Sequence, residues 1–429
     1  MDSAILIVTI IIMLILGVPV GICLASGILV LLLYDPVTSI GFIASKMYSG
    51  VAAFPLIALP FFMLAGVLME TGGLSKRLVA AADSLIGRMT GGLGMVTILA
   101  CMFFGAISGV AVAVVAAIGS VMIPQMIKQG YSKVYATALV TVAGGLGVIV
   151  PPSYPLVLYG VVNNESVGSL FMAGIGPSTV VTLLLISFNY YFSRKYGYTG
   201  SGVPFSMKRV ITTFWEAKWA LLMPIIILGG IYGGIVTPTE AAVIAVVYGL
   251  IVSKYIYKEN TWGKIIKMYK DNATFFAALM LTFAPAAALG PIFSYLGIPQ
   301  AINEFILSIS KNPYIVLAMI FLIMIPVGMF VQTNVIIIVL SPILLGVVKN
   351  LGVNPIHFGV FMVMCVCIAF VTPPAANSLF VASQISGISI DKIAKASIPF
   401  IIALSIATLL VAYFPITCFG LLKLLGIPY

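Results

Sequence analysis

The chain has 429 residues, of which 62% are hydrophobic and only 7% are charged, and its mean hydropathy is +1.22. A soluble domain carries about 25% charged residues, so this composition excludes a soluble globular protein. The formal net charge of +10 fits cytoplasmic loops rich in lysine and arginine better than it fits a nucleic-acid partner. We therefore expect an all-α polytopic membrane protein that contacts membrane lipid and no nucleic acid.

The first apolar run extends to Leu33, and no lysine or arginine precedes it. A signal peptide has a positively charged start and a shorter apolar core. We therefore expect this run to be a retained first span.

Two later blocks, residues 89–127 and 312–348, contain no formal charge. A helix rises about 1.5 Å per residue, so either block would run far past a bilayer core of about 30 Å as one helix. Small or polar residues near the block centres are candidates for a turn: Gly105, Ser108 and Gly109 in the first, and Gly328, Gln332, Thr333 and Asn334 in the second. We expect two re-entrant helical hairpins. The alternative is a plain pair of spans joined by a loop outside the membrane.

A Pro-Pro pair, Pro151 and Pro152, interrupts the apolar segment that follows the first hairpin. Proline lacks an N–H and its ring clashes with the preceding turn, so the pair breaks the helix expected over about 134–160. Three backbone carbonyls would then lack partners: those of Gly147, Val148 and Ile149. Because unsatisfied polar groups are costly in hydrocarbon, a dehydrated sodium ion is one suitable partner. A proline kink resolved by neighbouring helices is the alternative.

Residues 193–218 form a basic segment that we expect to be a cytoplasmic linker between two halves of the chain. Downstream, the sequence TPTE has the form of a capping box, with Thr237 at the N-cap and Glu240 at the third helical position. We favour this structural cap over a proton-relay role, although an acid inside a span is by default a functional candidate.

The chain repeats itself at a constant offset of 222 positions. Gly130 matches Gly352, and the first Pro-Pro pair matches a second pair, Pro373 and Pro374, in a helix expected over about 356–385. Internal repeats in membrane proteins are typical of transporters, whose site lies at the repeat interface. We expect two inverted repeats, over residues 1–192 and 219–429.

These patterns predict a site where each hairpin tip meets a broken helix. The candidate sodium-binding residues are Gly105, Ser108, Gly144, Gly147, Val148, Pro151, Gly328, Gln332, Thr333, Thr372 and Pro373. The candidate substrate-binding residues are Ser108, Ser153, Tyr154, Asn334 and Asn377. Helix N-termini at the breaks offer N–H groups and positive dipole ends to an anionic substrate. No cofactor other than sodium is expected.

Four motifs together, FFGAISG, GGLGVIVPPS, GGIVTPTEAA and FVTPPAANS, resemble the large membrane subunit of tripartite ATP-independent periplasmic (TRAP) transporters, over nearly the whole chain. The resemblance implies a multi-pass protein of the bacterial inner membrane in which a transport domain slides against a scaffold, driven by sodium, in an elevator mechanism. It also implies a small four-helix membrane subunit and a periplasmic binding protein that delivers an organic carboxylate. Among carboxylates we favour sialic acid or a related sugar acid, with C4-dicarboxylates next. Gln332 stands where an acid is expected in many relatives.

Two other functions remain open at this point. A stand-alone sodium/organic anion carrier without a binding protein would share the repeats and the breaks. An intramembrane serine hydrolase would need Ser108 close to the single histidine, His357. The five cysteines all lie in apolar segments, and we expect them to be packing residues.

Overall fold

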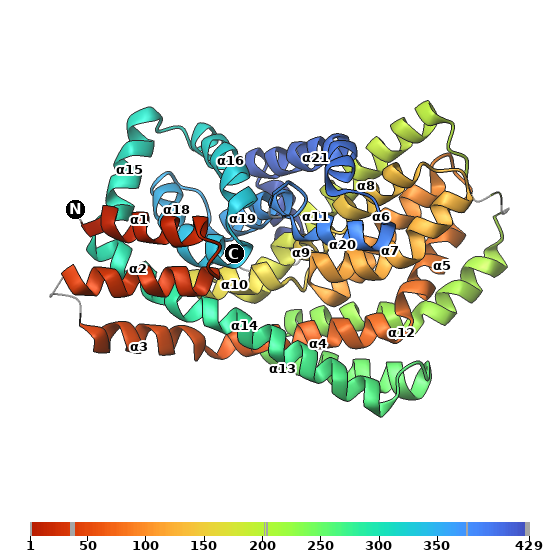
Figure 1. Ribbon diagram of the computed structural model, residues 1–429. Helices are drawn as coiled ribbons and strands as arrows, with labels where there is room; N and C mark the ends of the chain where they lie inside the picture. The colour runs from red at the N-terminus through yellow and green to blue at the C-terminus, as the bar shows by residue number, and fades with distance from the viewer. Residues whose placement is uncertain (1, 35–38, 201, 203–204, 375, 425–429) are drawn as a thin grey trace.

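The computed structural model describes residues 2–34, 39–200, 202, 205–374 and 376–424, and every secondary-structure element in these residues is helical (Figure 1). The elements of the first half are α1 (Asp2–Ile15), α2 (Val20–Tyr34), α3 (Ile40–Val51), η1 (Phe54–Ile57), α4 (Ala58–Thr71), α5 (Leu74–Ile86), α6 (Gly92–Ser108), α7 (Ala111–Lys128), α8 (Lys133–Ala143), α9 (Leu146–Ile149), α10 (Tyr154–Asn163) and α11 (Val167–Tyr196).

The second half is likewise built from helices. Its elements are α12 (Met207–Tyr232), α13 (Pro238–Ile251), η2 (Val252–Ile256), α14 (Trp262–Tyr295), α15 (Ile298–Ile309), α16 (Pro313–Phe330), α17 (Thr333–Val335), η3 (Ile336–Leu340), α18 (Ser341–Asn350), α19 (Pro355–Ala369), α20 (Asn377–Ser386), α21 (Ile390–Tyr413) and α22 (Ile416–Leu424). Among the described residues, ten helical stretches are long and apolar enough to cross a membrane. The predicted all-α polytopic architecture is confirmed.

The first apolar run differs from the prediction of one span. It forms two helices, α1 and α2, that pack against each other. Gly17 adopts a left-handed conformation between them (φ +76°), and Pro19 follows. Because glycine tolerates this conformation and proline cannot continue a helix, the pair ends α1 and turns the chain back.

One side of the molecule is a layer of long helices. Helix α14 packs against α2, α3 and α4, and α13 packs against α4 and α12; α3, α4, α12, α13 and α14 line the lower edge of Figure 1. Gly50 of α3 faces Ala287 of α14 so closely that any Cβ at Gly50 would overlap the alanine side chain. A glycine is therefore required for this close approach of two helices.

The other side contains the two hairpins and the two broken helices. Helices α6 and α7 form the first hairpin, and α16 with α17–η3–α18 forms the second. The first broken helix is α8–α9 followed by α10, and the second is α19 followed by α20. The outgoing arm of each hairpin packs beside a half-helix of the opposite repeat, since α7 contacts α20 and α18 contacts α10.

Repeat-related turns have the same backbone conformation. Gly130 before α8 and Gly352 before α19 are both left-handed, with φ of +84° and +80°. Gly73 before α5 and Gly297 before α15 are likewise left-handed, with φ of +74° and +68°. These matches agree with the repeat read from the sequence, where the glycine positions carried the signal.

The repeat-related turns lie at opposite ends of the molecule. Tyr198, at the C-terminal end of α11, accepts a hydrogen bond from the backbone N–H two residues after Gly130 (3.2 Å). The turn at Gly352 instead leads to Pro355, whose carbonyl accepts from the Tyr159 hydroxyl (2.9 Å), and Tyr159 belongs to α10 at the other end of α11. The two repeats are therefore inverted.

The end near Tyr198 is strongly basic. The Arg77 guanidinium lies 3.8 Å from the centroid of the Tyr257 ring, and the Tyr257 hydroxyl donates to the carbonyl of Glu216 (2.8 Å). Arg209 forms an ion pair with Asp83. These contacts bring the basic segment 193–218 and a second basic segment, residues 254–270, to one end, as a shared cytoplasmic side requires. The segment 193–218 contains the last four residues of α11 and the first twelve residues of α12, so the connection between these helices is shorter than the expected linker. We refer to this end as the basic end.

Candidate functional site

The first hairpin turns at Gly109 and Val110, close to the first Pro-Pro pair. Gly109 is left-handed (φ +65°), and its carbonyl accepts a hydrogen bond from the Tyr154 N–H (3.2 Å). A Cβ at Gly109 would lie only 2.7 Å from the Pro152 carbonyl oxygen. The tip is thus buried inside the protein against the broken helix, as a re-entrant hairpin requires.

The second hairpin meets its broken helix in the same way. In the first repeat, a Cβ at Gly105 would lie 3.0 Å from the Gly147 Cα. In the second, a Cβ at Gly328 would overlap the side chain of Ala369. Ala369 is the repeat counterpart of Gly147 at the offset of 222. Equivalent positions of hairpin and broken helix are therefore in contact in both repeats.

Two predicted substrate residues from different repeats bind each other. The Tyr154 hydroxyl donates to Oδ1 of Asn334. Nine residues further along α10, the Asn163 amide donates to the Ser341 hydroxyl (2.7 Å), so α10 and the outgoing arm of the second hairpin run parallel. Both begin beside the Tyr154–Asn334 bond, and their N-terminal dipole ends favour an anion there.

The other two half-helices form an equivalent pair. Helix α7 begins just after the first tip and packs against α20, which begins just after the second Pro-Pro pair. A Cβ at Gly119 of α7 would lie 3.5 Å from Ile385 of α20. Four half-helices therefore begin at the hairpin tips and at the Pro-Pro breaks. The segments around these starts contain no lysine or arginine.

The carbonyls freed by the first break are partly satisfied within the protein. The Val148 carbonyl accepts a hydrogen bond from the Ser153 hydroxyl, so the expectation that it lacks a partner is wrong. The Gly144 carbonyl accepts from the Gly147 N–H (3.0 Å), and that of Gly105 from the Gly109 N–H (2.9 Å). Ser153 lies directly after the prolines and reaches back over them. A carbonyl oxygen has a second lone pair, so these oxygens can still bind a cation.

The second break follows the same pattern with different groups. The carbonyl of Phe370, the repeat counterpart of Val148, accepts from the Ser378 N–H (3.3 Å). The Thr372 hydroxyl donates to the Ile368 carbonyl (2.8 Å), which leaves its oxygen lone pairs available. The Ser378 hydroxyl is fully buried and has no partner among the described residues. Sequence reasoning missed Ser378, although it lies in the motif FVTPPAANS.

The remaining predicted residues differ in their surroundings. Gln332 occupies the N-cap position of α17 without a side-chain cap and is exposed. Asn377 is exposed at the start of α20. Pro151 is buried against Gly174, whereas Thr333 and Pro373 are half-buried.

A serine–histidine pair is not formed. Nε2 of His357 lies 2.8 Å from the carbonyl oxygen of Val411, and the ring is buried in α19. The Ser108 hydroxyl accepts from the Val110 N–H at the hairpin tip (3.4 Å). The hydrolase alternative requires these two side chains to contact each other, and the structure gives both of them other partners.

Glu240 forms the predicted capping box. Its carboxylate accepts from the Thr237 N–H (2.7 Å), and its own N–H donates to the Thr237 hydroxyl (3.3 Å). Glu240 is exposed at the start of α13, in the layer of long helices. It therefore acts as a helix cap.

The atoms at the site that could bind a cation are the oxygens of backbone carbonyls, hydroxyls and side-chain amides. Hard monovalent and divalent cations prefer oxygen ligands. In the described part of the chain, no group of three or more histidine, cysteine, aspartate or glutamate side chains could hold a metal ion. The donor set thus fits a weakly held alkali cation.

A protein-family model described as "Tripartite ATP-independent periplasmic transporter, DctM component" matches residues 7–417. The isethionate TRAP transporter permease protein DctMQ of Oleidesulfovibrio alaskensis is 40% identical over 398 residues, which cover 93% of this chain and 62% of that protein. The chain thus spans less than two thirds of the length of this relative.

Two further relatives match over nearly their whole length. The C4-dicarboxylate TRAP transporter large permease protein DctM of Rhodobacter capsulatus is 33% identical, with 96% of both chains covered. The sialic acid TRAP transporter large permease protein SiaM of Vibrio cholerae is 35% identical, with 93% of both chains covered. Among solved structures, the YdaH transporter of Alcanivorax borkumensis matches with a TM-score of 0.62 at 14% identity, with 86% of both chains covered.

Proposed function

Because the chain belongs to the DctM family of tripartite ATP-independent periplasmic transporters, and is thus a multi-pass protein of the bacterial inner membrane, we propose that it carries out sodium-coupled uptake of an organic acid. The observation that carries the proposal is the pairing of half-helices from the two inverted repeats beside the hairpin tips, α10 with the outgoing arm of the second hairpin and α7 with α20.

Sodium is the coupling ion in this proposal. The two Pro-Pro breaks and the two hairpin tips gather carbonyl and hydroxyl oxygens without a cluster of acidic or histidine side chains. One sodium ion would bind between Ser108 and the segment 144–151. Its repeat mate would bind between Gln332, Thr333 and the segment 372–373, with the buried Ser378 hydroxyl as a further candidate ligand.

The substrate is an organic anion bound between the repeats. Tyr154 and Asn334 join the N-terminal ends of two half-helices. Asn377 starts α20, and Ser108 ends α6 three residues before α7 begins. Binding by N–H groups, hydroxyls and amides suits a hydroxylated acid. We favour sialic acid or a related sugar acid, then a C4-dicarboxylate; the relative at 40% identity, named for isethionate, adds a hydroxylated sulfonate to the acids to be tested.

Transport would proceed by an elevator movement. The hairpins and broken helices would move as one body against the layer formed by α3, α4, α12, α13 and α14. A small four-helix membrane subunit would extend this layer, and a periplasmic binding protein would deliver the substrate.

The test is uptake into proteoliposomes that contain the chain with its small subunit. Radiolabelled sialic acid, succinate and isethionate are offered one at a time, with and without an inward sodium gradient and the binding protein. We expect accumulation of one acid only with both the gradient and the binding protein. Uptake of an acid by the single chain would contradict the tripartite assignment, and uptake independent of sodium would contradict the coupling ion.

A further inference from the structure

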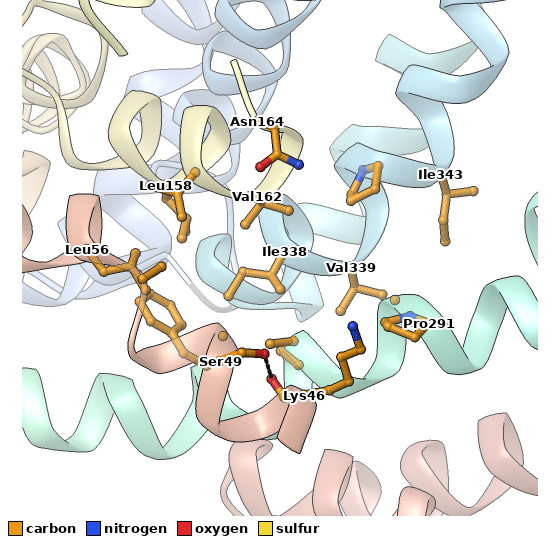
Figure 2. A pocket seen from close by; sticks show the side chains of 18 of the residues that line it. Lys46, Ser49, Leu56, Leu158, Val162, Asn164, Pro291, Ile338, Val339 and Ile343 are labelled. Carbon is orange, nitrogen blue, oxygen red and sulfur yellow. Dashed lines mark hydrogen bonds between the residues drawn. The ribbon is translucent and has the colours of Figure 1, made fainter. Parts of the chain in front are cut away.

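A cavity of about 660 Å³ separates the layer of long helices from the body that contains the hairpins. Helices α3 and α14 form one wall, and the end of α10 with η3 and the start of α18 form the other (Figure 2). Its lining is mostly aliphatic, as Leu158 and Ile338 illustrate. The cavity therefore lies between the two parts of the molecule that the proposed mechanism moves.

The inner end of this cavity lies close to the candidate substrate site. Leu158 follows Tyr154 by four residues on α10, and Ile338 follows Asn334 by four residues on the hairpin arm. Four residues are about one helical turn. The cavity thus begins one turn beyond the Tyr154–Asn334 bond.

The cavity extends from there towards the end of the molecule opposite the basic end. It is lined by Asn164, which ends α10, and by Pro299, in the first turn of α15. The Asn164 turn lies on the side of Tyr159 and Pro355, whereas the basic end lies around Tyr198. Under the positive-inside rule the cavity is on the periplasmic side.

Lys46 is the one charged residue in the lining of this cavity. Its side chain extends from α3 into the space between Pro291 of α14 and Val339 of η3 (Figure 2). The ammonium nitrogen lies 5.5 Å from the centroid of the Phe42 ring. Neither of the two ion pairs found among the described residues involves Lys46. Within the part of the chain that the structure describes, no carboxylate thus pairs with the charge that Lys46 presents to the cavity.

We propose that this cavity is the outer approach to the substrate site and that Lys46 is the residue that selects for anions there, taking the carboxylate or sulfonate of the incoming acid. The proposal rests on the proposed function and adds a specificity-determining residue to it. The hairpin tips contain no lysine or arginine, so attraction of an anion over more than hydrogen-bond distance must come from elsewhere. A charge in a cleft with apolar walls focuses its field and raises the local concentration of ions of opposite sign.

Lys46 belongs to the layer of long helices, whereas Tyr154 and Asn334 belong to the other body. Movement of that body would carry the bound acid away from the ammonium. The attraction would then help loading from the periplasm and would not hold the acid back after movement.

A first experiment tests the attraction without knowledge of the substrate. Ser294 lines the cavity and is exposed, and the five native cysteines are all buried. In a Ser294→Cys background, the thiol is modified with anionic sulfonatoethyl methanethiosulfonate or with its cationic trimethylammonium analogue. The measured quantity is the rate of modification by the anionic reagent divided by the rate of modification by the cationic reagent. We expect Lys46→Gln to lower this ratio about three- to tenfold.

The matched control is Lys349→Gln, which removes an exposed lysine from the end of α18 that does not line the cavity. It should leave the ratio unchanged. An unchanged ratio in Lys46→Gln would overturn the proposal. The measurement is repeated in vesicles with and without phosphatidylglycerol. An effect of Lys46 confined to the vesicles that contain this lipid would assign the cavity to a lipid headgroup and also overturn the proposal.

A second experiment measures transport of whichever of the three acids is accumulated. We expect Lys46→Gln to raise KM several-fold with little change in kcat, and Lys46→Arg to restore KM. The KM of the unmodified protein should rise with ionic strength more steeply than that of Lys46→Gln. If none of the acids is transported, the proposed function fails, while the thiol modification still decides the role of Lys46. Normal transport with an unchanged KM in Lys46→Gln would overturn only the role of Lys46.

Discussion

The Cys367 thiol donates a hydrogen bond to the carbonyl of Gly145 (3.2 Å), and these two residues are repeat counterparts, 222 positions apart. Positions related by a two-fold axis can touch only where the axis passes between them. The two broken helices therefore cross at the pseudo-two-fold axis of the inverted repeats. A Cβ at Gly145 would lie 2.5 Å from the Cys367 sulfur, so the crossing needs a glycine on one side.

Gly145→Ala tests this crossing. We expect it to lower the free energy of unfolding by about 1–3 kcal/mol, because the added methyl group overpacks a buried contact. Thermal unfolding in detergent measures the effect. The double variant with Cys367→Ala should recover much of the loss, since the clashing sulfur is removed. Equal losses in the single and double variants would contradict the contact.

Tyr154→Phe tests the bond between the repeats at the substrate site. The change removes the donor to Asn334, and a hydrogen bond contributes about 1 kcal/mol, so we expect KM for the transported acid to rise roughly fivefold. The control is Tyr159→Phe on the same helix, which removes the bond to Pro355 instead. It should lower stability and leave KM unchanged; equal KM values in all three proteins would exclude a binding role for Tyr154.

Removal of sodium tests the cation sites directly. An ion that binds only the folded protein stabilises it by about 2.7 kcal/mol at a hundredfold excess over Kd. We expect the midpoint of thermal unfolding to rise with sodium and not with choline at equal ionic strength. Thr372→Val removes one candidate hydroxyl ligand and should weaken the response. Identical melting curves in both salts would argue against a site for sodium.

Glu240→Gln tests the assignment of this acid as a helix cap. A glutamine can still accept from the Thr237 N–H, so we expect sodium dependence and pH dependence of uptake to stay as in the unmodified protein. Thr237→Ala, which removes the reciprocal hydroxyl, should lower the melting midpoint slightly. A lost pH dependence in Glu240→Gln would instead indicate proton transfer through the carboxylate.

The large features of the fold follow from local sequence rules. Uncharged blocks too long for one span predicted the hairpins, and the matched glycines and prolines predicted the repeat. The first apolar run was wrongly assigned to one span because its length hid the break at Gly17 and Pro19.

The contacts at the site were harder to predict. Tyr154 and Asn334 were named separately as polar residues near the breaks, but their bond joins positions 180 residues apart. The Ser153 hydroxyl was named as a substrate ligand, but its hydrogen bond to the Val148 carbonyl across the tight bend was not foreseen. Such pairings depend on three-dimensional packing, which periodicity and spacing do not encode.

The turns at Gly130 and Gly352 are repeat counterparts that lie at opposite ends of the molecule. Lys128 and Lys133 flank the first turn, and Lys349 alone flanks the second. These two turns thus differ by a single lysine, so the orientation of the two halves must be set mainly by the basic segments at the basic end.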